Sequence, residues 1–274
     1  MASNKVVIAV LFIAMVTMFA ASNVVVADDG EEIAYQECYE NGMRLGATEE
    51  SVKRECRNIV KDHDDTKSTA EIANWLAEGL QHYLPPEVEP NLKKLGLVGH
   101  SRGGKVAFGL ALALIGVDPA DGMDKGKQTP PAVLTYVPHS LNNLDMPVMV
   151  TGSGLGEVKR NPFFPACATK GVNHRDFYNE CFKPACYFVA KDYGHNDMLD
   201  DETKGIQGKA TYCLCKQGKS REPMRRFVGG VLLAFLEACL EGNSNDLIAI
   251  RDGHVTLPVE LQDTDFRKQD GKSP

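Results

Sequence analysis

The stretch LGLVGHSRGGKVAF, residues 95–108, joins an apolar run, a serine flanked by closely spaced glycines, and a second apolar run. The first run predicts a short buried strand, and the pattern from Gly103 onward is helical. Gly99, Ser101 and Gly103 form G-x-S-x-G, a pattern in which a nucleophilic serine occupies a tight turn between strand and helix. Glycines avoid clashes with the neighbouring backbone there. Ser101 is therefore predicted to be a nucleophile, although serine and glycine are also common in ordinary turns.

A serine nucleophile also needs a base, and in this type of site the acid and then the histidine follow the serine along the chain. His195 lies in KDYGHNDML, just after a predicted strand at 185–194, where a loop at the carboxyl edge can hold an imidazole over Ser101. Its position favours it over the other candidate histidines, which are His139, His174 and His254.

The acid and the oxyanion donor are also expected close to the carboxyl edge of the sheet. Asp118 follows an apolar run in IGVDPADG and is the favoured acid, while Asp121 and Glu157 remain alternatives. Arg102 is expected to begin the helix after Ser101, and its backbone N–H can stabilise an oxyanion there.

The rest of the chain indicates a mainly parallel α/β sheet with flanking helices. Buried strands are predicted at 146–154 and 185–194, and a closing helix at 221–242 ends at Gly242. Strands that alternate with helices in this way favour parallel pairing. Ser68-x-x-Glu71 reads as a capping box that starts an amphipathic helix, with Ile72, Trp75, Leu76, Leu80 and Tyr83 on one face.

The first 65 residues read differently from the rest. Residues 1–27 have the layout of a secretory signal peptide, with Lys5 before an apolar stretch and small residues up to Ala27; a retained signal anchor is the alternative. Residues 28–65 predict a small helical segment of two short helices, the second capped by Thr48. Residues 66–274 would form the main domain.

The amino-acid composition of the chain argues against some classes of partner and ligand. The formal net charge is −7 and no block of Lys and Arg is present, which argues against nucleic acid. An oxidising compartment would make disulfides or buried thiols the expected state of the eight cysteines, and Cys38 and Cys56 are placed to bridge. Zinc is disfavoured because neither Cys181-x4-Cys186 nor Cys213-x-Cys215 has C-x2-C spacing.

Several longer segments of the sequence resemble the plant chlorophyllases, esterases of the α/β-hydrolase fold. The segments run in one order between about residues 66 and 250: GHSRGGKVAF, GVDPADG, LTYVPHS, TGSGLGE, GVNHRDFYNEC, DYGHNDMLDD and MRRFVGGVLLAFLEACLEG. The resemblance implies Ser101 as nucleophile, Asp118 as acid and His195 as base. It also implies hydrolysis of the phytyl ester of chlorophyll or a related porphyrin ester, without a cofactor or protein-bound metal.

The resemblance also raises two expectations about location and contacts. A plastid or endomembrane location is the alternative to secretion, with membrane association only through the substrate or an uncleaved amino-terminal segment. An aromatic mouth for the substrate is expected from Phe163, Phe164, Phe177 and Tyr178, with core packing as the equal alternative.

The chain departs from this family before Ser101. Several strands are expected there, including one whose following loop supplies a second oxyanion donor, and the spacing to Asp118 is also short. The sequence therefore predicts an amino-terminally truncated domain whose strand at 94–98 lacks a neighbour. The competing hypothesis is a catalytically impaired or non-catalytic secreted protein with a vestigial hydrolase domain.

Overall fold

The structure is a computed structural model that describes residues 6–14, 39–40, 43, 48–110, 114–121, 126–129, 132–141, 146–162, 165–201 and 214–267. Among these residues, six strands form one sheet in the order β1-β2-β3-β4-β5-β6. Neighbouring strands are parallel except for β6, which pairs antiparallel with β5. The prediction of a mainly parallel α/β sheet is confirmed. The strands are β1 (Val6–Ala14), β2 (Val88–His100), β3 (Leu114–Val117), β4 (Val148–Ser153), β5 (Ala185–Ala190) and β6 (Leu261–Arg267).

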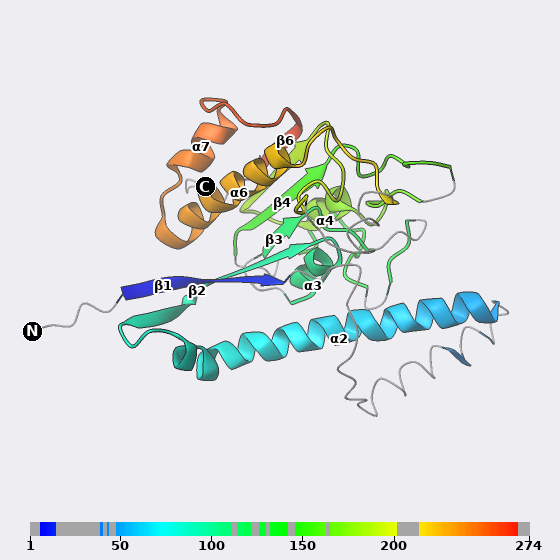
Figure 1. Ribbon diagram of the computed structural model, residues 1–274, viewed down its shortest axis with the longest axis horizontal. Helices are drawn as coiled ribbons and strands as arrows, with labels where there is room; N and C mark the ends of the chain where they lie inside the picture. The colour runs from blue at the N-terminus through cyan, green and yellow to red at the C-terminus, as the bar shows by residue number, and fades with distance from the viewer. Residues whose placement is uncertain are drawn as a thin grey trace, which may run out of the picture.

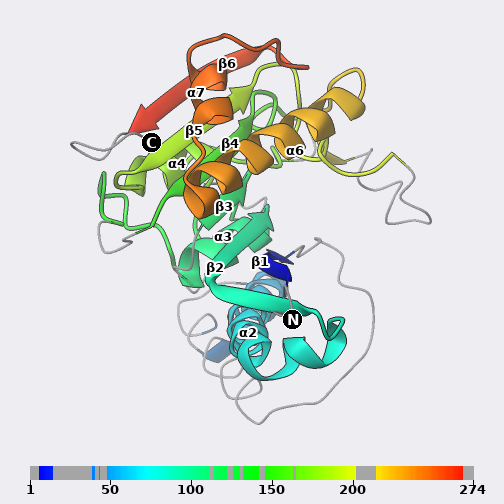
Figure 2. The same ribbon diagram turned by 90° about the vertical axis from the view of Figure 1, so that its left-hand side faces the viewer.

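Helices cover both faces of this sheet because successive strand residues point to opposite sides. Figure 1 and Figure 2 show α6 and α7 on the opposite side of the sheet from α2. The helices are α2 (Glu49–Gly79), α3 (Arg102–Leu110), α4 (His174–Glu180), α6 (Glu222–Leu236) and α7 (Asn245–Arg251). A short 3-10 helix, η1 (Leu80–Tyr83), follows α2, and a π-helical turn, η2 (Glu237–Glu241), continues α6. Gly242 ends that turn with φ 72°, as predicted for the closing helix.

Each face of the sheet carries its own apolar core. In β5, Cys186 and Phe188 face α6, where they pack with Phe227 and Val231. The alternate β5 residues, Ala185, Tyr187 and Val189, belong to the core on the other face, which includes Ala107 and Phe108 of α3 and Phe177 and Tyr178 of α4. The packing alternative is therefore correct for Phe177 and Tyr178, and Phe163 and Phe164 lie outside the described residues.

The amino-terminal helices differ from their prediction. Thr48 does precede a helix, but α2 continues without a break to Gly79, across the domain boundary expected after residue 65. Ser68 lies inside α2, so the predicted capping box is wrong. Its neighbour Thr69 instead donates from Oγ1 to the Asp65 carbonyl at 2.6 Å, a bond that a helix interior accommodates. The helix continues past Ser68 because the residues on both sides favour helix and include no glycine or proline before Gly79.

The predicted apolar face of α2 is only partly covered. Leu76 is 6% exposed, whereas Ile72 is 43% and Trp75 is 44% exposed, and Tyr83 stands out into solvent beside Trp75. The amphipathic pattern is real, but the described residues bury only part of its apolar side.

β2 is longer than the predicted strand and has a neighbour on each side. Residues 6–14, which the sequence assigned to a signal peptide, form β1 and pair with β2 from Val6–Val88 to Ala14–Gly99. The expectation that the strand at 94–98 lacks a neighbour is therefore wrong for this structure. A run of branched and apolar residues is as compatible with a buried parallel strand as with a signal sequence. Signal-peptide cleavage remains a prediction.

Among the described residues, no helix is both long and apolar enough to cross a membrane. Within those same residues, no cluster of three or more His, Cys, Asp or Glu side chains could hold a metal ion.

Candidate active site

Ser101 occupies the tight turn between β2 and α3, with a backbone φ of 57°. The left-handed conformation is strained for a residue with a side chain, and such strain is typical of a nucleophile turn. A Cβ atom on Gly99 would lie 2.0 Å from the Gly103 carbonyl oxygen, so the turn requires glycine at position 99. The predicted reason for G-x-S-x-G is thus visible in the backbone.

The acid loop is attached directly to this turn. Ser101 donates its N–H to the Val117 carbonyl at 3.2 Å, and the Ala120 N–H donates to the Ser101 carbonyl at 3.3 Å. A Cβ on Gly104 would lie 2.7 Å from Pro119 Cβ, so a glycine is also needed where α3 passes the loop. The loop after β3 and the start of α3 therefore hold each other in place.

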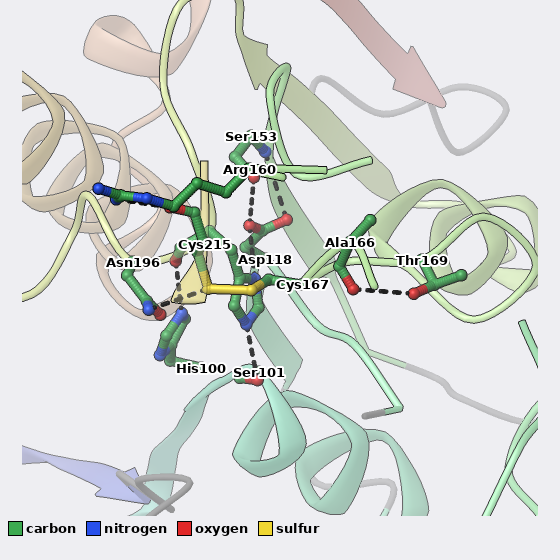
Figure 3. The surroundings of a disulfide bond; sticks show 11 residues. His100, Ser101, Asp118, Ser153, Arg160, Ala166, Cys167, Thr169, Asn196 and Cys215 are labelled. Carbon is green, nitrogen blue, oxygen red and sulfur yellow. Dashed lines mark hydrogen bonds and ion pairs between the residues drawn. A yellow bond between two sulfur atoms is a disulfide. The ribbon is translucent and has the colours of Figure 1, made fainter. Parts of the chain in front are cut away.

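Ser101, His195 and Asp118 lie along one line of hydrogen bonds. His195 Nε2 is 2.8 Å from Ser101 Oγ, and His195 Nδ1 is 2.9 Å from Asp118 Oδ2. A carboxylate only accepts, so Nδ1 carries the proton, and Nε2 is left to accept from the serine hydroxyl. All three side chains are buried, and Figure 3 shows Ser101 and Asp118 at the two ends of this line.

Asp118 is held as a carboxylate by its surroundings. Burial alone would raise its pKa, but the charge and hydrogen bond of His195, the nearby His174 and a hydrogen bond from Ser153 outweigh it and lower the pKa. Ser153 donates both its hydroxyl and its N–H to the two carboxylate oxygens of Asp118. Asp118 is therefore ionised and oriented toward His195.

The alternative acids make different contacts. Asp121 forms a buried ion pair with Lys105, whose Nζ lies 3.0 Å from Asp121 Oδ1 and also donates to the Thr129 carbonyl. Glu157 accepts from Asn173 Nδ2 at 2.8 Å. Neither carboxylate has a hydrogen bond to His195 among the described contacts, so the geometry joins Asp118 alone of the three candidates to that ring.

Among the alternative bases, His174 is buried near the acid. Its Nε2 is 3.9 Å from Asp118 Oδ1, while its Nδ1 is 2.7 Å from the Tyr187 hydroxyl. Burial is the main cause that lowers the His174 pKa, so this ring is neutral at neutral pH. His139 and His254 are exposed, and His139 Nδ1 lies 3.1 Å from the Cys181 carbonyl. Among the described residues, His195 is the one of these four rings that is hydrogen-bonded to Ser101 Oγ.

His100, which sequence reasoning passed over, supports the base from the other side. Its Nε2 is 3.0 Å from the His195 carbonyl, and the two ring centroids are 4.9 Å apart. Loss of hydration, followed by the nearby charge of His195, lowers the His100 pKa to about 4. His100 therefore stays neutral and donates to that carbonyl. In the sequence, the signal for this supporting role was the position of His100 next to Ser101 in the motif.

Arg102, the predicted oxyanion donor, is the first residue of α3. Its backbone N–H lies at the N-terminus of α3, where the helix dipole favours negative charge. Its guanidinium reaches Asp65 at 2.7 Å and links α3 to α2. A cavity of about 390 Å³ lies between these helices, lined by residues such as Thr66, Ala70, Arg102 and Val106, but Ser101 and His195 do not line it.

Apart from Cys38 and Cys56, the sequence left the cysteines without a predicted pairing. Cys167 and Cys215 form a disulfide that contacts Asn196, the residue after His195, while Cys181 and Cys186 are buried free thiols. Burial raises the pKa of Cys181 to about 12, so it is an unreactive thiol at neutral pH. The expected bridge between Cys38 and Cys56 lies outside the residues whose side chains are described.

Comparisons with known proteins agree on one family. The family profile described as Chlorophyllase matches residues 54–268. Chlorophyllase-2 of Arabidopsis thaliana is 58% identical, over 73% of this chain and 67% of its own length. Chlorophyllase-1 of Arabidopsis thaliana is 44% identical over 69% and 62%, and Chlorophyllase-1, chloroplastic, of Citrus unshiu is 38% identical over 74% and 63%. The chain thus spans about two thirds of the length of the relatives that it matches.

Several solved structures are also similar to this chain. A ferulic acid esterase from Streptomyces cinnamoneus is 14% identical, has a TM-score of 0.48, and is matched over 75% of this chain and 56% of its own.

Proposed function

Because this chain belongs to the chlorophyllase family, we propose that it is a serine esterase that hydrolyses chlorophyll to chlorophyllide and phytol, a step of chlorophyll catabolism. The observation that carries the proposal is the hydrogen-bonded line from Ser101 through His195 to Asp118. A buried serine bonded to an imidazole, which is in turn bonded to a carboxylate, is the arrangement of an activated nucleophile.

The first half of the reaction would acylate Ser101. Ser101 Oγ attacks the carbonyl carbon of the propionate ester while His195 Nε2 takes the hydroxyl proton. Asp118, held ionised by its hydrogen bonds, stabilises the imidazolium that forms. The tetrahedral oxyanion collapses, the C–O bond to phytol breaks, and His195 returns its proton to the phytol oxygen. Chlorophyllide remains as an ester of Ser101.

The second half would release the acid product by the same groups. Water takes the place of phytol, and His195 removes its proton as the water oxygen attacks the acyl carbon. Collapse of the second tetrahedral oxyanion expels Ser101 Oγ, which regains a proton from His195. The Arg102 N–H is proposed to stabilise both oxyanions. Magnesium belongs to the substrate and has no part in these proton transfers.

The proposal is tested with purified protein on chlorophyll and on a short-chain p-nitrophenyl ester. Ser101→Ala and His195→Ala should each lower kcat by about 10³-fold or more, because each removes one member of a unit. The double variant should be no worse than either single variant. Ser68→Ala, at an exposed position of α2, is the matched control and should keep wild-type activity.

Two results would count against the proposal. Hydrolysis that is unchanged in Ser101→Ala would remove this serine from the chemistry, and losses that multiply in the double variant would mean that His195 acts independently. Wild-type protein that is folded but inactive on both esters would favour the vestigial, non-catalytic hypothesis.

The compartment is proposed from two kinds of evidence. Two Citrus relatives carry the word chloroplastic in their names, which supports the plastid alternative for this chain. The layout of residues 1–27 supports secretion, for which the expected product in a secretory host is a chain beginning at Asp28. Intact-mass measurement of the mature chain from each compartment distinguishes the two.

A further inference from the structure

The disulfide between Cys167 and Cys215 joins the two loops that flank the candidate active site. Cys167 lies between β4 and α4, and Cys215 lies shortly before α6. Both residues are buried, at 4% and 2% exposure. Figure 3 shows the bond beside the line from Asp118 to Ser101, with Asn196 pointing toward the sulfur of Cys215. The bond is therefore part of the wall of the site.

The Cys215 end of the bridge holds the loop that carries His195. Asn196, the next residue, donates from Nδ2 to the sulfur of Cys215 at 3.1 Å. Asp197 Oδ2 accepts at 2.7 Å from the N–H groups of both Gly194 and Gly218. A Cβ on Gly194 would lie only 1.8 Å from the Lys216 carbonyl oxygen, so the two segments are in direct backbone contact. The neighbours of His195 on both sides are thus attached to residues 215–218.

The Cys167 end of the bridge holds the side of the site that orients Asp118. Ala168, the next residue, donates its N–H to the Gly156 carbonyl at 3.0 Å, and the Gly156 N–H donates to the Ser153 carbonyl at 3.0 Å. Ser153 in turn donates twice to Asp118. The loop of Cys167 is therefore packed on the turn that fixes the carboxylate.

From these contacts we propose that the Cys167–Cys215 disulfide is a positioning element for His195, and that its reduction by a dithiol lowers turnover. Reduction transfers two electrons and two protons from the dithiol to the bridge; the S–S bond breaks, two thiols form, and the dithiol becomes a disulfide. The base loop is then joined to the acid side by hydrogen bonds and packing alone. A shift of about 1 Å in a catalytic group lowers rates by about 10²-fold.

The inference rests on the proposed roles of Ser101 and His195, so its test uses a readout that needs no chlorophyll. A fluorophosphonate probe reacts with a serine that is activated by its base, and its rate constant reports on the Ser101–His195 pair directly. The double variant Cys167→Ala/Cys215→Ala removes the bridge without leaving an unpaired thiol. Cys239→Ala removes a free, partly buried cysteine and is the matched control.

The double variant should react with the probe about 10- to 100-fold more slowly than the wild type, while Cys239→Ala should match the wild type. On the p-nitrophenyl ester, kcat should fall and KM should change less than about 2-fold, because the loss affects the chemistry rather than binding. A dithiol should slow the wild type in proportion to the reduction of Cys167 and Cys215, measured by alkylation and peptide mass analysis. It should not slow the double variant further.

A second variant guards against simple unfolding. Asn196→Ala keeps the bridge but removes its contact with the base loop, and it should slow the probe reaction several-fold with an unchanged circular dichroism spectrum. The inference is wrong if the folded double variant reacts with the probe at the wild-type rate. It is also wrong if a dithiol slows the wild type and the double variant equally. If the wild type reacts with the probe in a bridge-dependent way but hydrolyses no chlorophyll, the inference stands and the proposed substrate is wrong.

Discussion

Two regions of the sheet are built very differently. In the β4–β5 region, inside the sheet, every strand residue is buried, with α6 on one face and α3 and α4 on the other. At the β1–β2 end, β2 is buried only from Gly96 to Gly99, and its first eight residues are exposed or half-buried. Ser101 follows that buried portion after one half-buried residue, His100. The candidate site thus lies where the well-covered part of the sheet begins, because its geometry requires close packing on both faces.

The largest expected effect concerns the two aspartates of the acid loop, which follows β3 beside the well-covered region. Asp118→Asn should lower kcat by about 10⁴-fold, because an amide can no longer hold the His195 Nδ1–H as a carboxylate does. Asp121→Asn should leave Lys105 buried without its counter-charge and reduce stability by about 3–5 kcal/mol, with much less effect on kcat of the folded enzyme. Ester hydrolysis and urea unfolding of both variants check this. If Asp121→Asn lowered kcat more than Asp118→Asn did, Asp121 would be the acid.

The next effect concerns the β1–β2 end of the sheet. A chain that starts at Asp28 lacks β1, so β2 becomes an edge strand with unpaired N–H and C=O groups. Compared with the full chain, we expect a lower urea midpoint and more light scattering on standing. A chain without residues 268–274 keeps all described strands and serves as the control. Equal stability of the chain from Asp28 and the full chain would mean that β1 contributes nothing to the sheet.

A smaller effect comes from His100, the last residue of β2. Its pKa is about 4 in the folded chain and about 6.5 when unfolded. Between these values only the unfolded chain binds the proton, so stability falls as pH falls from 6.5 to 4, by up to ~3 kcal/mol. His174, whose pKa is also lowered, acts in the same direction. Asp118 loses its contribution only at still lower pH, as its lowered pKa is passed.

This pH dependence is measured from urea midpoints at pH 7 and pH 5. His100→Gln should flatten the difference between the two pH values, and His254→Gln, at an exposed position, should leave it unchanged. If the urea midpoint changed equally between pH 7 and pH 5 in the wild type and in His100→Gln, folding would not lower the pKa of His100.

The smallest effect is expected on the partly uncovered face of α2. Trp75→Phe should change the free energy of unfolding by less than about 0.5 kcal/mol, since the ring is 44% exposed and contacts Tyr83 at the surface. Leu76→Ala, at the adjacent buried position, should reduce stability by about 2–5 kcal/mol. Trp75 emission should resemble that of a hydrated indole. A blue-shifted emission would mean that this face is covered in solution.

The residues nearest the motif were the most predictable from sequence. The turn at Ser101, the strands at 148–153 and 185–190 and the closing helix all depend on local signals: glycines at a close approach, branched residues in a short run, and a helix-ending glycine. The order of acid and histidine then led to Asp118 and His195, which the structure brings together with Ser101. The break predicted near Ser68 failed because a local capping pattern has no effect when both flanking segments favour the helix.

The sequence by itself was enough to indicate a mainly parallel sheet and a serine, an aspartate and a histidine with compatible chemistry, because periodicity, turn glycines and side-chain type are local properties. Only the tertiary structure showed that His195 contacts Asp118 while Lys105 contacts Asp121, since both aspartates follow the same strand. It also decided the partner of Cys167, 48 residues away, and the pairing of residues 6–14 with β2. Such contacts join segments far apart in the chain, and packing selects them from several pairings that the local sequence permits equally.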